Sequence, residues 1–158
     1  MVEFESKASR YAIIALMGGI VGIVSVFVAW LDYWGIVTVS GWKVLTTILE
    51  NTSLSEIGEN YPFYMPLVIL VFSVCGMLCG LLALFKPGRA GGRGAVLSGA
   101  IVAVAPVFFI WKMYDGGASE VLSFGAFVAI AAGVVMVISG ALMNSSRTAI
   151  GESGTDDA

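Results

Sequence analysis

The sequence predicts an all-α membrane protein, a four-transmembrane-helix bundle with a small extracellular strand and helix in its first loop. Of its 158 residues, 58% are hydrophobic and only 12% are charged, whereas roughly a quarter of an ordinary soluble domain is charged. Four stretches lack Asp, Glu, Lys and Arg over about the 17 to 25 residues that a spanning helix needs. Strands of an outer-membrane barrel would be shorter and would alternate in polarity, so the spans are predicted to be helices.

The first expected span covers residues 11–30 and follows the cations Lys7 and Arg10. Its apolar stretch is longer than the roughly 7–15 residues of a secretory signal. Trp30, Asp32 and Tyr33 stand where a cleavage site would need small residues. We therefore expect an uncleaved first helix.

The outer loop, residues 31–61, is the only segment between spans that is long enough to fold. Its residues 36–39 favour an extended chain, and Gly35 and Gly41 bound that stretch. The next apolar residues fall on one helical face: Trp42, Leu45, Ile48 and Leu49. The loop is predicted to form a short strand or hairpin, followed by an amphipathic helix over the mouth of the bundle.

The remaining spans are expected at residues 62–85, 95–111 and 121–143, with a short basic loop at 86–93. With the first span and the outer loop, they complete a transmembrane domain of residues 1–143. Residues 144–158 contain mainly Ser, Thr, Gly and acidic residues. This composition predicts a disordered acidic cytoplasmic tail.

The distribution of Lys and Arg predicts the orientation. Six of the eight cations lie in the N-terminal tail, the 86–93 loop and the C-terminal tail, and only Lys43 and Lys112 lie on the other side. Because cytoplasmic loops are enriched in Lys and Arg, we expect a multi-pass protein of the cell (plasma) membrane with both termini in the cytoplasm. All four tryptophans then fall near the outer surface, where amphipathic rings prefer the headgroup level.

Small residues recur at four-residue spacing in every span, which lets helix backbones approach closely in a membrane. These rows predict packing within the bundle, with contact to a partner subunit as the alternative. The glycines in them are Gly18, Gly22, Gly76, Gly80, Gly99, Gly125 and Gly133.

The sequence offers no pattern typical of an enzyme, a cofactor site or a metal site. Histidine is absent, and the spans hold no acid or base, the residues that mark proton and ion pathways. The two cysteines, Cys75 and Cys79, are four residues apart on one helix and poorly placed for a disulfide. We expect them in the core, with lipidation of Cys79 as an alternative. The net charge of −3 argues against nucleic acid as a partner.

The outer loop carries a resemblance to known proteins. A helix ending at Trp30, a β-prone stretch and then Ser40, Gly41 and Trp42 resemble the small uncharacterised tetraspan proteins of archaea and bacteria. The four-span layout is also similar to claudin-like proteins, whose first loop carries Trp, then Gly-Leu-Trp, then two cysteines. Trp30 or Trp34 and the Gly41–Trp42 pair match its tryptophans, but the loop cysteines are absent. The resemblance implies a contact or scaffold role.

We therefore expect a structural, scaffold or accessory-subunit role through protein–protein contacts. The alternative is a subunit of a small oligomeric transporter or channel. The expected partners are membrane lipid and other membrane proteins, or a second copy of the chain. The candidate contact residues are Trp30, Trp34, Trp42, Leu45 and Leu49. The triplet Asn51, Thr52 and Ser53 is an acceptor for N-glycosylation at Asn51 on the outer side.

Overall fold

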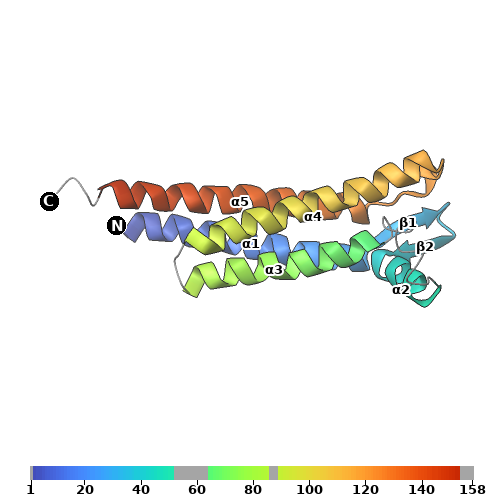
Figure 1. Ribbon diagram of the computed structural model, residues 1–158, viewed down its shortest axis with the longest axis horizontal. Coiled ribbons are helices and arrows are strands. Elements are labelled where there is room, and N and C mark those ends of the chain that lie inside the picture. Colours follow the sequence, from blue (N-terminus) through green and yellow to red (C-terminus); the bar gives the residue numbers. More distant parts are fainter. Residues whose placement is uncertain (1, 52–63, 86–88, 154–158) are drawn as a thin grey trace.

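The computed structural model describes residues 2–51, 64–85 and 89–153. It shows an all-α bundle of four long apolar helices: α1 (Val2–Phe27), α3 (Met65–Phe85), α4 (Arg89–Asp115) and α5 (Gly125–Ser153). The first loop holds a β-hairpin of β1 (Ala29–Tyr33) and β2 (Val37–Ser40), followed by the short helix α2 (Gly41–Asn51). Both termini lie at one end of the bundle, and the hairpin and α2 lie at the other (Figure 1). The predicted fold class is confirmed.

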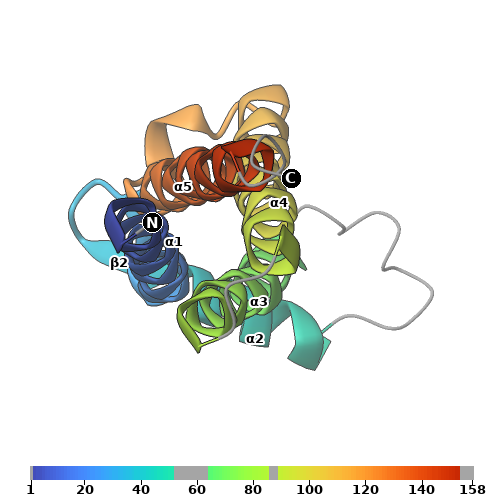
Figure 2. The same ribbon diagram turned by 90° about the vertical axis from the view of Figure 1, so that its left-hand side faces the viewer.

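The long helices form a ring in chain order. Each packs against the helix before it, α5 closes against α1, and diagonal pairs make little contact (Figure 2). This is the up-down-up-down arrangement of a four-helix bundle. The helices contain four candidate membrane spans: Lys7–Phe27, Met65–Phe85, Ala90–Asp115 and Gly125–Ser146. The chain is thus a multi-pass membrane protein.

Helix α1 ends at Phe27, before the expected boundary at residue 30. Residues 29–33 instead pair antiparallel with 37–40, with Asp32 opposite Thr38. The indole Nε1 of Trp30 turns back and donates a hydrogen bond to the carbonyl oxygen of Ser25 at 2.8 Å. That bond satisfies one of the carbonyl groups that a helix leaves unpaired at its C-terminus.

The basic loop expected at 86–93 is shorter than predicted, because α4 already begins at Arg89. The glycines in the first turn of α4 pack closely against other helices. A Cβ added at Gly91 would lie 2.8 Å from the Cβ of Ala83, and one at Gly92 would lie 3.1 Å from the carbonyl oxygen of Gly140. This close packing extends the helix through a glycine-rich stretch that local sequence favours as a turn.

Helix α5 likewise continues to Ser153, past the expected start of the tail at residue 144. The hydroxyls of Ser145 and Ser146 donate to the carbonyl oxygen of Leu142 at 3.0 and 2.8 Å. Serine can bond to a preceding helical carbonyl in this way without leaving the helix. Residues 154–158, the acidic end of the expected tail, lie outside the described residues.

The main hydrophobic cluster lies toward the hairpin end of the bundle. Its largest fully buried side chain is Trp30, which meets the ring of Phe109 edge to face at 5.0 Å between centroids. A short 3-10 helix, η3 (Ser119–Val121), closes the connection from α4 to α5. Ser123 N donates to the carbonyl oxygen of Trp30 at 2.9 Å, so this connection is tied to β1.

Candidate functional site

The hairpin turn presents a tryptophan in an unusual backbone conformation. Trp34 has φ +54° and Gly35 has φ +73°, and the amide of Ile36 donates to the carbonyl oxygen of Tyr33 at 3.0 Å. The amide of Gly35 donates to Oδ1 of Asp32 at 2.8 Å, which holds the turn from the strand side. Such tight hairpin turns favour Gly, Asn or Asp where φ is positive.

Trp34 is the one non-glycine residue with positive φ in the described part of the chain. A bulky residue there is a genuine outlier, and the strain costs on the order of 1–3 kcal/mol. The side chain is 77% exposed, so burial does not offset that strain. Folding alone therefore gives no reason for a tryptophan at this position.

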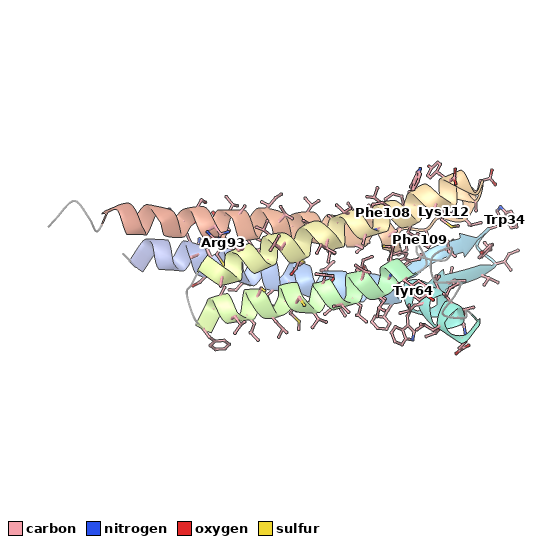
Figure 3. The ribbon with its side chains drawn as sticks, viewed as in Figure 1. Trp34, Tyr64, Arg93, Phe108, Phe109 and Lys112 are labelled. Carbon is pink, nitrogen blue, oxygen red and sulfur yellow. The ribbon has the colours of Figure 1, made fainter. Side chains whose placement is uncertain are left out.

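We define the hairpin tip as Tyr33, Trp34, Ile36 and Val37. All four are exposed hydrophobic residues, and Ile36 is 82% exposed. Figure 3 shows Trp34 at the far end of the hairpin, away from the helices. Single exposed apolar residues are ordinary, but a contiguous apolar group marks a contact surface.

The base of the hairpin, below the hairpin tip, is closely packed against the bundle. Trp30, at the start of the hairpin, is enclosed by the backbones of two glycines. A Cβ added at Gly41 would lie 2.9 Å from its Nε1, and one at Gly125 would lie 2.6 Å from its Cδ1. Leu31 makes a β-bridge with Leu122. The exposed end therefore stands on packed structure, which is the usual way a scaffold positions a contact loop.

The structure divides the five predicted contact residues into two groups. Trp34, Trp42 and Leu49 are exposed, whereas Trp30 and Leu45 are buried core residues. The structure corrects the prediction of Trp30 and Leu45 as contact residues, because side chains buried in the core are not available to a partner. The other three hairpin-tip residues, Tyr33, Ile36 and Val37, were not predicted as contacts. Their position on either side of the Trp34–Gly35 turn is the signal that would have identified them.

Helix α2 also differs from its predicted face. Val44 and Leu45 are buried, while Trp42 and Leu49 point outward. The Trp42 ring stacks on Phe27 of α1 at 5.8 Å between centroids. The buried face of α2 is therefore centred on Val44 and Leu45 and differs from the predicted face, because the preceding hairpin sets the orientation of α2 against the bundle. Asn51 is the last residue of α2, and the rest of its acceptor triplet lies outside the described residues.

All seven predicted packing glycines lie at contacts between elements of the same chain. Three of them surround the side chain of Met136 on α5, from α1, α3 and α4 respectively: Gly18, Gly76 and Gly99. A Cβ at Gly18 would lie 2.7 Å from Met136 Cγ, and one at Gly76 would overlap Met136 Cε.

The remaining four predicted glycines contact other neighbours: Gly22 meets Ser73, Gly80 meets Leu16, Gly125 meets Ala29, and Gly133 meets Gly99. Gly19, which packs on Met77, is a further packing glycine that was not predicted.

Few polar side chains are buried in the described part of the bundle. Its buried polar side chains are Ser25, Ser73, Ser98 and Ser139. Ser25 and Ser139 donate to carbonyl oxygens of their own helices, Gly22 and Val135, both at 2.7 Å. Among the described residues, no group of three His, Cys, Asp or Glu side chains is placed to hold a metal ion.

Both cysteines have free thiols in the structure. Cys75 is exposed on the outside of α3, which corrects its expected place in the core. Cys79 is partly buried, with Sγ against Gly94 of α4.

Comparisons with protein-family models, curated proteins and solved structures find no match to this chain. Of the expected resemblance, the four candidate spans and the hairpin between the first two long helices are present. No family is identified, and neither a claudin-like relationship nor an archaeal origin is supported.

Proposed function

We propose that this protein is a structural or accessory membrane protein that acts through protein–protein contacts made by the hairpin tip. The observation that carries the proposal is Trp34, which is exposed and held at φ +54° at the end of a hairpin whose base is packed against the bundle. Backbone strain retained without a packing benefit is typical of functional positions. Tryptophan is also among the residues that contribute most to protein interfaces.

Exposed residues of α2 extend the proposed contact surface. Trp42 and Leu49 add apolar area beside the hairpin. Lys43, Asp32 and Glu50 supply charged groups near this area. An apolar centre with a polar rim is the usual composition of a protein interface.

The alternative, an oligomeric transporter or channel subunit, receives less support. Met136 fills the middle of the bundle against glycines of the three other long helices. A conducting path would therefore have to lie between protomers. The interior supports a packed core better than a pore, so the contact role is the one we adopt.

In the proposed orientation the hairpin faces outward from the cell membrane and both termini lie in the cytoplasm. Arg93 is exposed at the end of the bundle that carries the termini, and Trp111 and Tyr114 are exposed at the hairpin end. Cations on the cytoplasmic side and aromatic rings at the interface support this assignment. With the hairpin outside, Asn51 becomes a proposed glycosylation acceptor.

Site-specific photocrosslinking in native membranes tests the contact role. A photoreactive phenylalanine at Trp34 should give discrete protein adducts that mass spectrometry can identify. The same residue at Val135, which is exposed on α5 within a span, should react with lipid. Adducts of Trp34 with lipid alone would show that the hairpin tip is a membrane anchor and would contradict the proposal.

A further inference from the structure

An apolar groove runs along the outside of the bundle between α3 and α4. Its volume is about 390 Å³, and it is lined by Met65 and Val68 of α3 and by five residues of α4: Ala100, Ile101, Val104, Ala105 and Phe108. The groove lies within two candidate spans, so it opens toward the lipid. From Ala100 to Phe108 it follows α4 for about 12 Å at 1.5 Å per residue.

One end of the groove leads to a cation. Lys112 lies four residues after Phe108 and seven residues after Ala105 on α4. Residues at these spacings share a helix face. Figure 3 shows Phe108 and Lys112 along the hairpin half of α4, with Tyr64 at the adjoining start of α3. Lys112 therefore stands where the groove approaches the membrane surface, and its long side chain can reach the headgroup level.

The charge of Lys112 remains accessible to a ligand. Its Nζ lies 3.8 Å from Oδ2 of Asp115, and both side chains are substantially exposed. An exposed ion pair of this length contributes little stability, so an anionic group can compete for the ammonium.

We propose that the α3–α4 groove binds one phospholipid of the leaflet on the hairpin side. An acyl chain would occupy the apolar groove, and the phosphate would bind Lys112. Charge complementarity distinguishes a phospholipid from a second copy of the protein, because the apolar groove ends beside a cation at headgroup depth. The groove would remove part of the acyl chain from bulk lipid, and the ammonium of Lys112 would bind the phosphate at the end of the groove.

The test is native mass spectrometry of the full-length protein released from nanodiscs that contain phosphatidylglycerol. The wild type should retain one phosphatidylglycerol per chain. Ala100→Phe fills the groove and should reduce retention at least about tenfold, since several buried methylene groups lose their site. Ala131→Phe is the matched control, because Ala131 is also an exposed alanine but lines the separate groove between α1 and α5. It should retain the lipid as the wild type does.

The headgroup contact has its own variants. Lys112→Gln should weaken retention about fivefold, the effect of one cation near a phosphate, whereas Lys43→Gln on α2 should not. Asp115→Asn should strengthen retention because it releases Lys112. Diacylglycerol with the same chains should be retained less well than phosphatidylglycerol.

Three outcomes would overturn the proposal. They are equal retention in Ala100→Phe and Ala131→Phe, no effect of Lys112→Gln, or a wild-type dimer that Ala100→Phe converts to a monomer. The third outcome would assign the groove to a second copy of the chain. Failure here leaves the hairpin-tip contact untouched, since the two surfaces share no residue.

Discussion

At the scale of single residues, Trp34 and Met136 illustrate opposite relations between a side chain and the fold. Trp34 is exposed, and its backbone is strained, so its identity works against stability. Met136 is fully buried and reaches the backbones of three other helices. Its flexible, unbranched side chain fits the irregular space that three glycines leave.

Replacing Trp34 by glycine should raise the stability of the fold while removing the proposed contact. Glycine adopts positive φ without steric cost, so the free energy of unfolding should rise by about 1 kcal/mol. Thermal unfolding in detergent measures the first effect, and photocrosslinking from a reporter at Ile36 measures the second. Ile36→Gly is the control: it lies in the same tip but not at positive φ, and it should not gain stability. A loss of stability in Trp34→Gly would contradict the strain argument.

Met136→Ala should destabilise the bundle by about 2–5 kcal/mol, the usual cost of truncating a buried methionine. Lipid does not fill an enclosed space in the middle of four helices, so the cavity would remain. Val135→Ala, on the exposed side of the same helix, should change stability by less than about 1 kcal/mol, because lipid replaces the lost contact. Denaturant titration of both variants in micelles measures the difference. Equal effects would mean that Met136 does not hold the helices together.

At the scale of elements, glycine positions determine how close the helices lie. A Cβ added at Gly133 of α5 would lie 2.6 Å from the carbonyl oxygen of Gly99 on α4. Between α1 and α3 the approach is similarly close: a Cβ added at Gly19 would lie 2.7 Å from the amide nitrogen of Met77, and one at Gly80 would lie 2.8 Å from that of Leu16. In a membrane, where lipid provides no hydrophobic drive between helices, such packing is the main source of association.

Gly133→Leu should therefore separate α4 from α5 and lower stability by more than Ala131→Leu. The two positions lie on the same helix, but Ala131 is exposed to lipid whereas Gly133 is buried. We expect the buried substitution to cost at least about 1–3 kcal/mol, as overpacking does in cores. Denaturant titration of the two variants measures the fraction folded and so compares their free energies of unfolding. A similar loss in both would show that added bulk, rather than the α4–α5 contact, is responsible.

At the scale of the whole molecule, the bundle has two chemically different ends. The termini lie at one end, and the hairpin and α2 lie at the other (Figure 1). Arg93 lies toward the end with the termini (Figure 3), whereas most exposed aromatic residues belong to the hairpin, to α2 or to the parts of the helices near them. The asymmetry supports a single orientation in the membrane, because Lys and Arg favour the cytoplasmic side.

Cysteine labelling in intact cells tests that orientation. In a variant with Cys75 and Cys79 replaced by serine, Thr47→Cys on α2 should react with a membrane-impermeant maleimide. Ser145→Cys, which is exposed near the other end of the bundle, should react only after the cells are opened. The reverse pattern would place the termini outside and overturn the proposed topology.

Local sequence determined the fold class, the number of spans and the occurrence of a strand and a helix in the first loop. Four uncharged apolar stretches have to be helices in a bilayer, because only an internally hydrogen-bonded backbone is stable there. The small-residue rows on these helices also indicated which faces pack, as the contacts of Gly18, Gly76 and Gly99 with Met136 illustrate. These features depend on composition and spacing, which are properties of the chain itself.

Tertiary structure decided where helices end and which loop residues are exposed. Trp30 was expected to end a helix and make outside contacts. It became a buried strand residue because its indole bonds to Ser25 and packs on Phe109. Trp34, four residues later, is exposed because the hairpin turn carries it away from that core. The two tryptophans are chemically identical, and only contacts between distant segments distinguish the core residue from the candidate contact residue.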